Sequence, residues 1–514
     1  MMSITSIYFL VFVLLGVCVY YICPKKIRWI WLLILSIAFY YESAKFISIL
    51  YIVSSALIAY CVTMLSDRIR LNKKDSHIPF VLTVTAIILI VGIWFFVKGR
   101  ELWGLVLSKI SYNTFSTLLD MELLAALGMG YYTLQITGYV IDCYWESIKV
   151  QKNPLKLLLF TLYFPQLITG PISRYSQLES LFEGHAFKYR NITFGSQRIL
   201  WGFIKKLVLA SRAGLIVDSI FMSPDSFHGF YSWVVILIYP IQMYADFSGC
   251  MDIVAGVSEL FGITLPENFN NPFFSRTSQE FWQRWHITLG AWAKDYVLYP
   301  ILKSRTMVKF GKFTRKLFNK SISKFLVNLI AMFFLWLVMG IWHGGLKYIV
   351  GVSLWYWIVM MLGEAFTPLF SKIVKVLKIK TESFSWHLFQ SCRTYLIYAT
   401  GAIFFYAGVR NGLNVISDAI KVFYVKDYAN PWIFFDGSIL NIVSHIDINI
   451  MIFVIFLLFV VAALREKYGY ARVWIEKQGF LFRWAIWLSL FAFVLIWGIY
   501  GPGYDASEFI YRGF

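Results

Sequence analysis

The chain has 514 residues, of which 59% are hydrophobic and 15% are charged, and its formal net charge is +19. A soluble domain of this composition could not cover its apolar surface with polar groups, so the sequence excludes an ordinary globular protein and predicts the lipid bilayer as solvent. The positive charge favours membrane topology over nucleic-acid binding, because Lys and Arg lie mainly between apolar runs, as the positive-inside rule expects.

Apolar runs long enough to cross a ~30 Å hydrocarbon core recur from Ile7 to Trp497. They lack the alternation of barrel strands, so we predict an all-α integral membrane protein with about a dozen transmembrane or re-entrant helices and interfacial amphipathic helices. The first run, Ile7 to Cys23, has no signal-peptide cleavage site, and we expect it to remain in the mature protein.

Basic loops predict the orientation of the spans. Clusters after the first and third spans, and at 303–324, 372–380 and 465–477, should be cytoplasmic, which places both termini outside. The clusters after the first and third spans consist of Lys25, Lys26, Arg28, Arg68, Arg70, Lys73 and Lys74. Without an internal repeat or a long linker, we expect one membrane domain over 1–514, with N-terminal spans in 1–120, a core in 121–370 and C-terminal spans in 371–514.

The segment Tyr163–Ser173 predicts a broken helix, because Pro165, Gly170 and Pro171 interrupt it. Irregular backbone at membrane depth is tolerated where it is buried in protein or lines a cavity. The segment is therefore either a wall of a substrate passage or a plain kink between helices.

The stretch 244–301 mixes too many polar and glycine residues into apolar surroundings to be a plain span. Within it, Thr277 and Glu280 have capping-box spacing and Pro300 marks a stop, which predicts one helix of about twenty residues. Its aromatic face, which includes Trp282 and Trp285, is typical of an amphipathic helix at the cytoplasmic membrane interface.

Two histidines are candidates for chemistry. His286 lies on the predicted interfacial helix, where it is either packed among tryptophans or functional. His343 ends an apolar run at the turn 342–345 of a predicted hairpin, where it either snorkels to the outer interface or lines an aqueous cavity. A neutral imidazole can accept a proton from an attacking hydroxyl. With His286 near the cytoplasm and His343 opening outward, the pair would suit transfer of a group across the bilayer.

Five stretches of the chain resemble the membrane-bound O-acyltransferase (MBOAT) family, in its branch of alginate O-acetyltransferases and teichoic-acid D-alanyltransferases. They are YYTLQITGYVIDCYW (131–145), FPQLITGPISRYSQL (164–178), FSGCMDIVAGVSELFGITLPENFNNPF (247–273), SQEFWQRWHITLGAWAKDYVLYP (278–300) and MGIWHGG (339–345). The resemblance implies a funnel-shaped helical fold in a bacterial plasma membrane, with His343 and His286 matching the family's two histidines.

The resemblance also implies the substrates and partners. A cytoplasmic acyl thioester, acetyl-CoA or an acyl carrier protein, would meet a narrow passage, and an extracytoplasmic acyltransferase partner would help deliver the acyl group to a polysaccharide. No permanently bound cofactor or metal is expected. We assign catalytic roles to His343 and His286 and predict a substrate-binding set, which consists of Trp282, Trp285, Trp342, Asn268, Asn270, Ser248 and Asp252.

Within this branch, exopolysaccharide acetylation is favoured over D-alanylation of teichoic acid. The chain continues for about 170 residues past His343, longer than the compact D-alanyl enzymes, and its aromatic end, 509–514, resembles that of alginate-type acetyltransferases. Arg512 and Gly513 depart from that tail pattern. A lipid or glycan transporter without chemistry and an inactive scaffold for an extracellular acyltransferase are the alternatives from other classes.

Overall fold

The computed structural model describes residues 2–500 except 45, 74–75, 100–102, 104–126, 168, 224–226 and 427–442, so the tail 509–514 lies outside the described residues. Across the described ranges every regular element is a helix, and the β pairing consists of one isolated bridge between Phe269 and Trp285. Seven of these described helices are long and apolar enough to cross a membrane, and Ile7–Ile22 is a shorter apolar helix. The predicted all-α membrane fold is confirmed.

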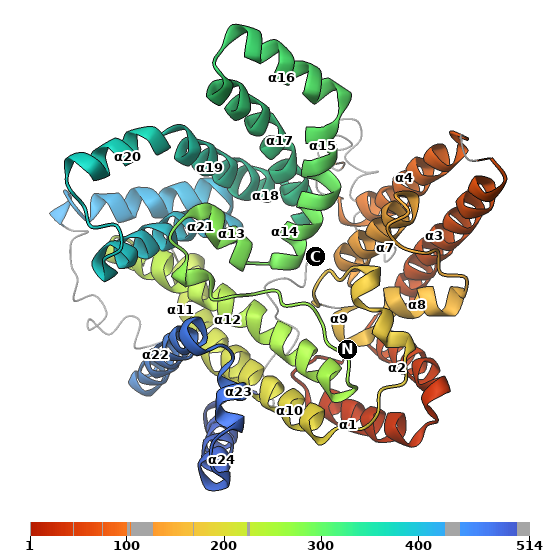
Figure 1. The fold of residues 1–514 in the computed structure, drawn as a ribbon. Helices are drawn as coiled ribbons and strands as arrows, with labels where there is room; N and C mark the ends of the chain where they lie inside the picture. The colour runs from red at the N-terminus through yellow and green to blue at the C-terminus, as the bar shows by residue number, and fades with distance from the viewer. Residues whose placement is uncertain are drawn as a thin grey trace, which may run out of the picture. The chain divides into compact units, whose positions relative to one another are not determined.

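The chain forms two compact units, each made of segments from different parts of the sequence. Figure 1 shows the helices coloured in chain order. Unit 1 comprises Met1–Leu207, Asp246–Glu267 and Tyr470–Phe514, and unit 2 comprises Val208–Ala245 and Asn268–Gly469. The long helix α12 (Phe230–Leu260) therefore gives its first half to unit 2 and its second half to unit 1. One membrane domain with boundaries near 120 and 370 stays a prediction.

Unit 1 is built from an N-terminal set of helices, one broken segment and the C-terminal helices. Helices α3, α4 and α7 pack against one another, and α8 packs on α2 and α3. The elements are α1 (Ile7–Ile22), η1 (Lys25–Ile27), α2 (Arg28–Ser43), α3 (Phe46–Asn72), α4 (Ile78–Lys98), α7 (Met129–Tyr144), α8 (Pro154–Leu162), α9 (Phe164–Leu167), η3 (Tyr175–Gln177), η4 (Glu179–Phe182), α10 (Tyr189–Phe203), the start of the π-helix η5 (Ile204–Ala210), α23 (Ala471–Glu476) and α24 (Phe480–Trp497).

The predicted break in the segment Tyr163–Ser173 is confirmed. Helix α8 ends at Leu162, the short α9 follows, and the chain leaves the helical conformation before Pro171. The side chain of Ser173 donates to Gln166 Oε1 at 3.1 Å, and Gln135 Nε2 donates to the carbonyl oxygen of Pro171 at 3.4 Å. These contacts satisfy part of the buried irregular backbone, whereas its role as a passage wall stays a prediction.

Helices α10 and α12 touch backbone to backbone within unit 1. A Cβ atom on Gly202 would lie 2.6 Å from the carbonyl oxygen of Gly249, and one on Gly256 would lie 2.6 Å from that of Gly195. Real Cβ atoms do not approach so closely, so both crossing points require glycine. Gly195 and Gly202 are seven residues apart on α10, and Gly249 and Gly256 are seven residues apart on α12. This spacing keeps both glycines of a helix on one face.

The mutation Gly202→Ala is expected to destabilise the protein by about 1–3 kcal/mol, because the added methyl group forces the two helices apart. The matched control is Gly92→Ala in α4, where no atom lies within 4 Å of the added Cβ. That change should be neutral or stabilising by up to about 1 kcal/mol, since alanine favours helix over glycine. Thermal unfolding of both variants in detergent would test this, and equal effects would contradict the close contact.

Unit 2 holds the predicted hairpin and most of the remaining helices. Its elements are the end of η5, α11 (Ser211–Met222), η6 (Pro272–Phe274), α13 (Ser278–Arg284), α14 (Ile287–Ala293), the π-helix η7 (Lys294–Leu298), α15 (Tyr299–Lys303), α16 (Arg305–Leu317), α17 (Lys320–His343), α18 (Leu346–Tyr348), the π-helix η8 (Ile349–Leu354), α19 (Trp355–Ala365), α20 (Thr367–Val376), α21 (Phe384–Lys421) and α22 (His445–Tyr468). Helix α17 packs against η8 and α19, which confirms the out-and-back hairpin.

Candidate active site

His343 is the last residue of α17, where the chain turns at two glycines. Gly344 and Gly345 have φ of 79° and 73°, a region that other residues rarely adopt. The imidazole is buried, at 9% exposure, and its Nδ1 lies 2.6 Å from the carbonyl oxygen of Met339. Because a carbonyl oxygen can only accept, this contact assigns the hydrogen to Nδ1 and leaves the lone pair on Nε2.

His286 interrupts the helix that the sequence predicts between Thr277 and Pro300. The start of that helix is confirmed, because Glu280 N donates to Thr277 Oγ1 at 3.1 Å. The single continuous helix is wrong, since His286 has φ 45° and ψ 51° and separates α13 from α14. The expected stop is also wrong, because Pro300 lies in α15, and the helical run that continues from η7 ends only at Lys303.

A short antiparallel backbone pairing causes this break. Asn270 N donates to the carbonyl oxygen of Arg284 at 2.9 Å, and Ile287 N donates to that of Asn268 at 3.0 Å. These bonds hold the chain around His286 beside the segment before η6, so the bonds of a continuous helix cannot form there. The pairing brings the side chains of Asn268 and His286 together.

The Asn268 side chain organises the His286 imidazole. Its Oδ1 lies 3.2 Å from His286 Nδ1 and accepts from Thr288 N at 3.1 Å and from Thr288 Oγ1 at 2.9 Å. Oδ1 is an acceptor, so the hydrogen is assigned to His286 Nδ1 and the lone pair to Nε2, as in His343. Burial lowers the pKa of His286 well below its usual value, and the nearby His343 lowers it further, which keeps the ring neutral.

Trp342 contacts both histidines. Its ring centroid lies 4.8 Å from that of His343 and 6.0 Å from that of His286. Both imidazoles therefore flank one indole and cannot lie at opposite faces of a ~30 Å hydrocarbon core. The expectation of one histidine on each side of the membrane is wrong; the sequence could not reveal the break that turns His286 towards α17.

Aromatic rings surround the histidine pair. The ring of His343 lies 5.9 Å from that of Tyr348 and 5.8 Å from that of Phe405. Trp282 packs edge-on against Trp336 and Tyr356, at 4.9 and 4.7 Å between ring centroids. The surroundings of the histidine pair and of Trp282 are therefore mainly aromatic.

The other predicted binding residues of unit 2 lie around the same segment. Trp285 packs against Phe269 at 5.1 Å and Tyr398 at 5.0 Å between ring centroids. The Asn270 side chain is exposed, and the backbone N–H of Asn270 donates to the Arg284 carbonyl oxygen. The neighbouring Asn271, which sequence reasoning missed, is buried and donates to Glu466 Oε1 at 2.9 Å.

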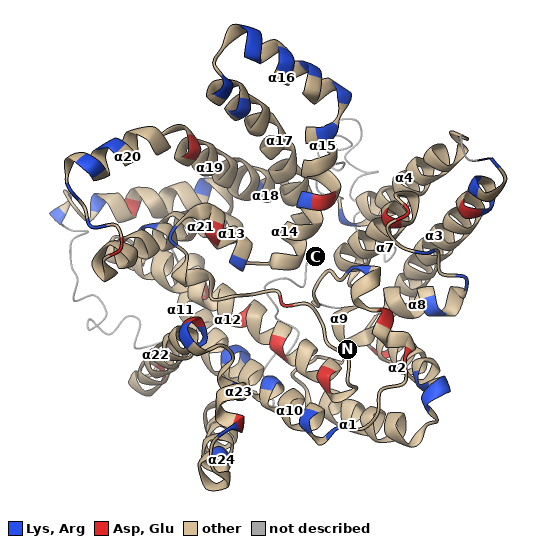
Figure 2. Ribbon diagram, in the orientation of Figure 1, with Lys and Arg blue, Asp and Glu red and all other residues tan. Residues whose placement is uncertain are grey.

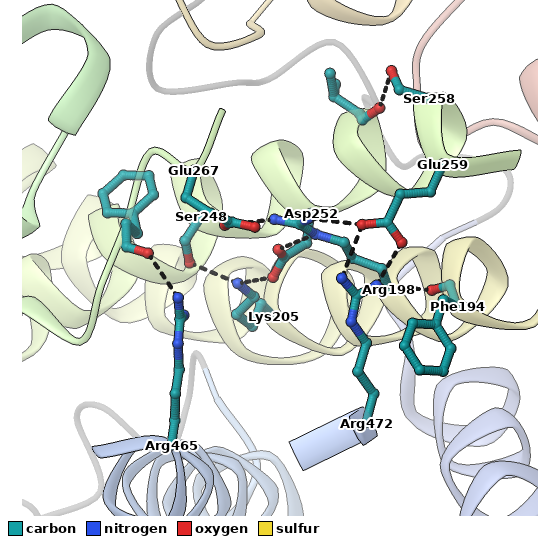
Figure 3. Close-up of polar contacts among 12 residues, drawn as sticks. Phe194, Arg198, Lys205, Ser248, Asp252, Ser258, Glu259, Glu267, Arg465 and Arg472 are labelled. Carbon is teal, nitrogen blue, oxygen red and sulfur yellow. Dashed lines mark hydrogen bonds and ion pairs between the residues drawn. The ribbon is translucent and has the colours of Figure 1, made fainter. Parts of the chain in front are cut away.

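Ser248 and Asp252 belong to unit 1, where they enter a buried ionic cluster (Figure 3). Lys205 Nζ donates to Ser248 Oγ at 2.9 Å and to Asp252 Oδ2 at 2.6 Å, while Arg198 Nε donates to Asp252 Oδ1 at 3.0 Å. Both carboxylate oxygens of Asp252 therefore accept from protein cations. Substrate binding by these two residues stays a prediction, and the structure assigns them structural partners.

The same cluster contains charges that the sequence alone did not connect. Arg198 donates to Glu259 at 3.0 Å and to Glu267 at 2.7 Å, and Arg472 from α23 binds both oxygens of Glu259 at 2.5 and 2.9 Å. Lys206 pairs with Asp246. The unit-1 ionic cluster has four cations and four anions: Arg198, Lys205, Lys206, Arg472, Asp246, Asp252, Glu259 and Glu267.

No group of three or more His, Cys, Asp or Glu side chains that could hold a metal ion occurs in the part of the chain that the structure describes. The two buried imidazoles, each with the hydrogen assigned to Nδ1 and the lone pair to Nε2, can accept and donate protons. Together with the apolar helices, this site defines a multi-pass membrane protein with a paired-histidine centre.

Comparison with known proteins identifies the family. The model of the membrane-bound O-acyltransferase family, MBOAT, matches residues 146–409, just over half of the chain, and the match includes both histidines. The chain belongs to this family. The predicted family resemblance is thereby confirmed.

Curated relatives carry three kinds of printed name. The chain is 28% identical over 284 residues to the probable alginate O-acetylase AlgI of Pseudomonas syringae pv. tomato, covering 55% of this chain and 49% of the relative. It is 29% identical over 345 residues to a peptidoglycan O-acetyltransferase of Helicobacter pylori, covering 61% and 60%. It is 31% identical over 231 residues to a teichoic acid D-alanyltransferase of Bacillus subtilis, covering 43% and 55%. The chain thus spans about half the length of the curated relatives it matches.

Proposed function

We propose that this protein is a membrane O-acyltransferase that moves an acyl group, most simply acetyl, from a cytoplasmic thioester to a hydroxyl on the other side of a bacterial plasma membrane. The final acceptor would be an extracellular polysaccharide, reached with the help of an extracytoplasmic acyltransferase partner. The donor would be acetyl-CoA or an acyl carrier protein. Family membership and the printed names of the relatives support the reaction class.

One observation carries the chemical part of the proposal. His343 Nδ1 donates its hydrogen to the Met339 carbonyl oxygen, so His343 Nε2 carries no hydrogen and can act as a base. The acceptor hydroxyl oxygen attacks the thioester carbonyl carbon, the C–S bond breaks, and the hydroxyl proton passes through Nε2 to the leaving thiolate. The products are an ester and a thiol, so atoms and charge balance.

D-alanyl transfer is the second candidate. The Bacillus subtilis D-alanyltransferase matches this chain at 31% identity, within the 28–32% range of the alginate acetylases. Both reactions join an acyl thioester to a hydroxyl, and the paired-histidine centre suits either. The acyl donor distinguishes them.

The decisive experiment offers radiolabelled donors to the purified full chain in liposomes. We expect label from acetyl-CoA to appear as an ester on an added polysaccharide or on a partner serine, with release of free thiol. Label transferred only from a D-alanyl carrier protein would favour the second candidate. Movement of intact glycan without thioester consumption would favour a transporter and overturn the proposal.

The mutation Asn268→Asp tests whether Asn268 positions His286. A carboxylate beside Nδ1 stabilises the imidazolium, so it should raise the His286 pKa, which burial holds low in the wild type. The neutral base is lost as the pH falls through this pKa, so we expect the acid limb of the pH–rate profile to move to higher pH. Activity on the alkaline plateau should change less than at pH 6.

Two further variants separate positioning from folding. Asn268→Ala removes the acceptor and should lower activity roughly 10- to 100-fold, as the loss of a buried hydrogen bond predicts. Asn414→Ala is the matched control, because its side chain is exposed on α21 of the same unit and lies outside the predicted binding set. A pH profile of Asn268→Asp that coincides with that of the wild type would contradict the positioning role.

A further inference from the structure

Two amphipathic helices of unit 2, α16 and α20, combine basic side chains with exposed apolar ones. Neither helix contains an Asp or Glu (Figure 2). We call the exposed cations of these helices the basic helix pair. It consists of Arg305, Lys309, Lys312, Arg315, Lys316, Lys372 and Lys375.

Helix α16 separates its cations from its packed face. Arg305, Lys309, Lys312 and Lys316 recur at three- and four-residue spacing, which places them on one side of the helix. The opposite side packs on α17, where Thr314 Oγ1 lies 2.7 Å from Ser323 Oγ. None of the described residues offers these four cations an ion-pair partner, so their charge is available to something outside the chain.

Apolar side chains flank the cations instead of covering a core. On α16, Phe313 and Leu317 are exposed, and on α20, Phe370 and Val376 are exposed, whereas α20 buries none of its residues. Exposure of these apolar side chains to water would be energetically unfavourable. At the boundary between lipid headgroups and acyl chains, both kinds of side chain find their preferred surroundings.

The two helices lie at the same end of the α17–α19 hairpin. Helix α16 directly precedes α17, and α20 directly follows α19, which runs back along α17. Asn328, in the first half of α17, donates to Glu364 near the end of α19 at 2.6 Å, so the end of α19 lies beside the first half of α17. Both basic helices therefore adjoin the half of the hairpin away from His343.

The histidine pair lies at the other end of α17. Helix α16 packs along the first half of α17, where Gly311 lies beside Val327. Val327 is 16 residues from His343, or about 24 Å at 1.5 Å per residue, so this part of α16 lies in the half of the hairpin away from the histidine pair. The exposed apolar side chains beside the cations favour a lipid surface over a soluble donor.

We propose that the basic helix pair binds the headgroups of anionic phospholipids and anchors unit 2 in the leaflet opposite to His343. The lysines and arginines contact lipid phosphates, while Phe313, Leu317, Phe370 and Val376 insert among the acyl chains. Each cation near an anionic surface adds about 1 kcal/mol, or about fivefold in affinity. This inference does not depend on the proposed reaction.

The test uses the purified full chain in nanodiscs that contain equal parts phosphatidylglycerol and phosphatidylcholine. Native mass spectrometry counts the lipids retained, and thermal unfolding is compared between nanodiscs of each lipid alone. We expect wild type to retain phosphatidylglycerol preferentially and to unfold at a higher temperature in it. Changing Lys309, Lys312, Lys316, Lys372 and Lys375 to Gln should lower the enrichment by at least about tenfold.

Two matched variants make the result specific. A variant with Arg at the same five positions should keep the enrichment. That result would show that the five-Gln variant loses lipid because it loses charge. Five exposed lysines of unit 1, changed to Gln, reproduce the change in net charge: Lys25, Lys26, Lys149, Lys152 and Lys188. They should leave most of the enrichment intact.

Three outcomes would overturn the proposal. The five-Gln variant could keep its phosphatidylglycerol enrichment, or the unit-1 control could lose it equally, which would assign the effect to net charge. The five-Gln variant could also keep its lipids and lose binding of acetyl-CoA, which would make the helices a donor site. Single-helix variants, at Lys309 and Lys312 or at Lys372 and Lys375, serve if the full variant does not fold, and each should lose part of the enrichment.

Discussion

Replacing His343 with Ala is expected to lower acyl transfer by about 10²- to 10⁴-fold, the range that a positioned general base contributes. The mutation removes the Nε2 lone pair that the Met339 carbonyl oxygen orients, and no other described imidazole occupies its place. Initial rates of ester formation from radiolabelled thioester in liposomes measure the effect. Unchanged rates would remove His343 from the chemistry.

The controls distinguish lost chemistry from lost structure. His445→Ala changes an exposed histidine at the start of α22 in the same unit and should leave the rate within about twofold, as surface substitutions usually do. His343→Ala should elute from gel filtration as the wild type does. A rate loss matched by an equal loss of folded protein would point to packing around Trp342 and against catalysis.

Replacing Arg198 with Ala is expected to destabilise the protein by about 3–5 kcal/mol, because it removes a buried cation that three partly buried carboxylates share. Burial alone lowers the pKa of Arg198, but the carboxylates of Asp252, Glu267 and Glu259 outweigh it and raise the pKa, so the guanidinium stays charged. Thermal unfolding in detergent and the yield of folded protein measure the loss.

An internal control exists on the same helix. Arg190 also binds a carboxylate through two nitrogens, to Glu476 at 3.0 Å each, but its side chain is 59% exposed. Arg190→Ala should therefore cost about 0–1 kcal/mol. Arg198→Lys keeps the charge and loses the forked geometry, so an intermediate effect is expected. Similar stabilities of the two Ala variants would show that burial does not strengthen the cluster.

Local signals in the sequence predicted local features correctly. The Thr277 cap depends on residues three positions apart, and the turn after His343 depends on two consecutive glycines, so neighbouring residues suffice for both. The break at Pro165 and Pro171 follows from missing N–H groups and fixed φ angles. These three local features mark helix ends that the sequence predicts correctly, whereas the stop expected at Pro300 is wrong.

Features that depend on residues distant in sequence could not be predicted from the sequence pattern. The φ of 45° at His286 is held by the pairing with Asn268, eighteen residues away, and nothing in the spacing of the aromatic residues indicates it. No local pattern indicates that Arg472 binds Glu259, 213 positions earlier. Such pairs form only when the helices are packed.

The docking of α23 has a consequence for truncated genes. Arg472 lies more than sixty residues past the end of the family match at 409, yet it supplies one of the four cations of the unit-1 ionic cluster. A nonsense codon just before it would leave both histidines translated and Glu259 with Arg198 as its remaining cationic partner in that cluster. Loss-of-function alleles should therefore include truncations between the end of the family match and α23, far in sequence from His286 and His343.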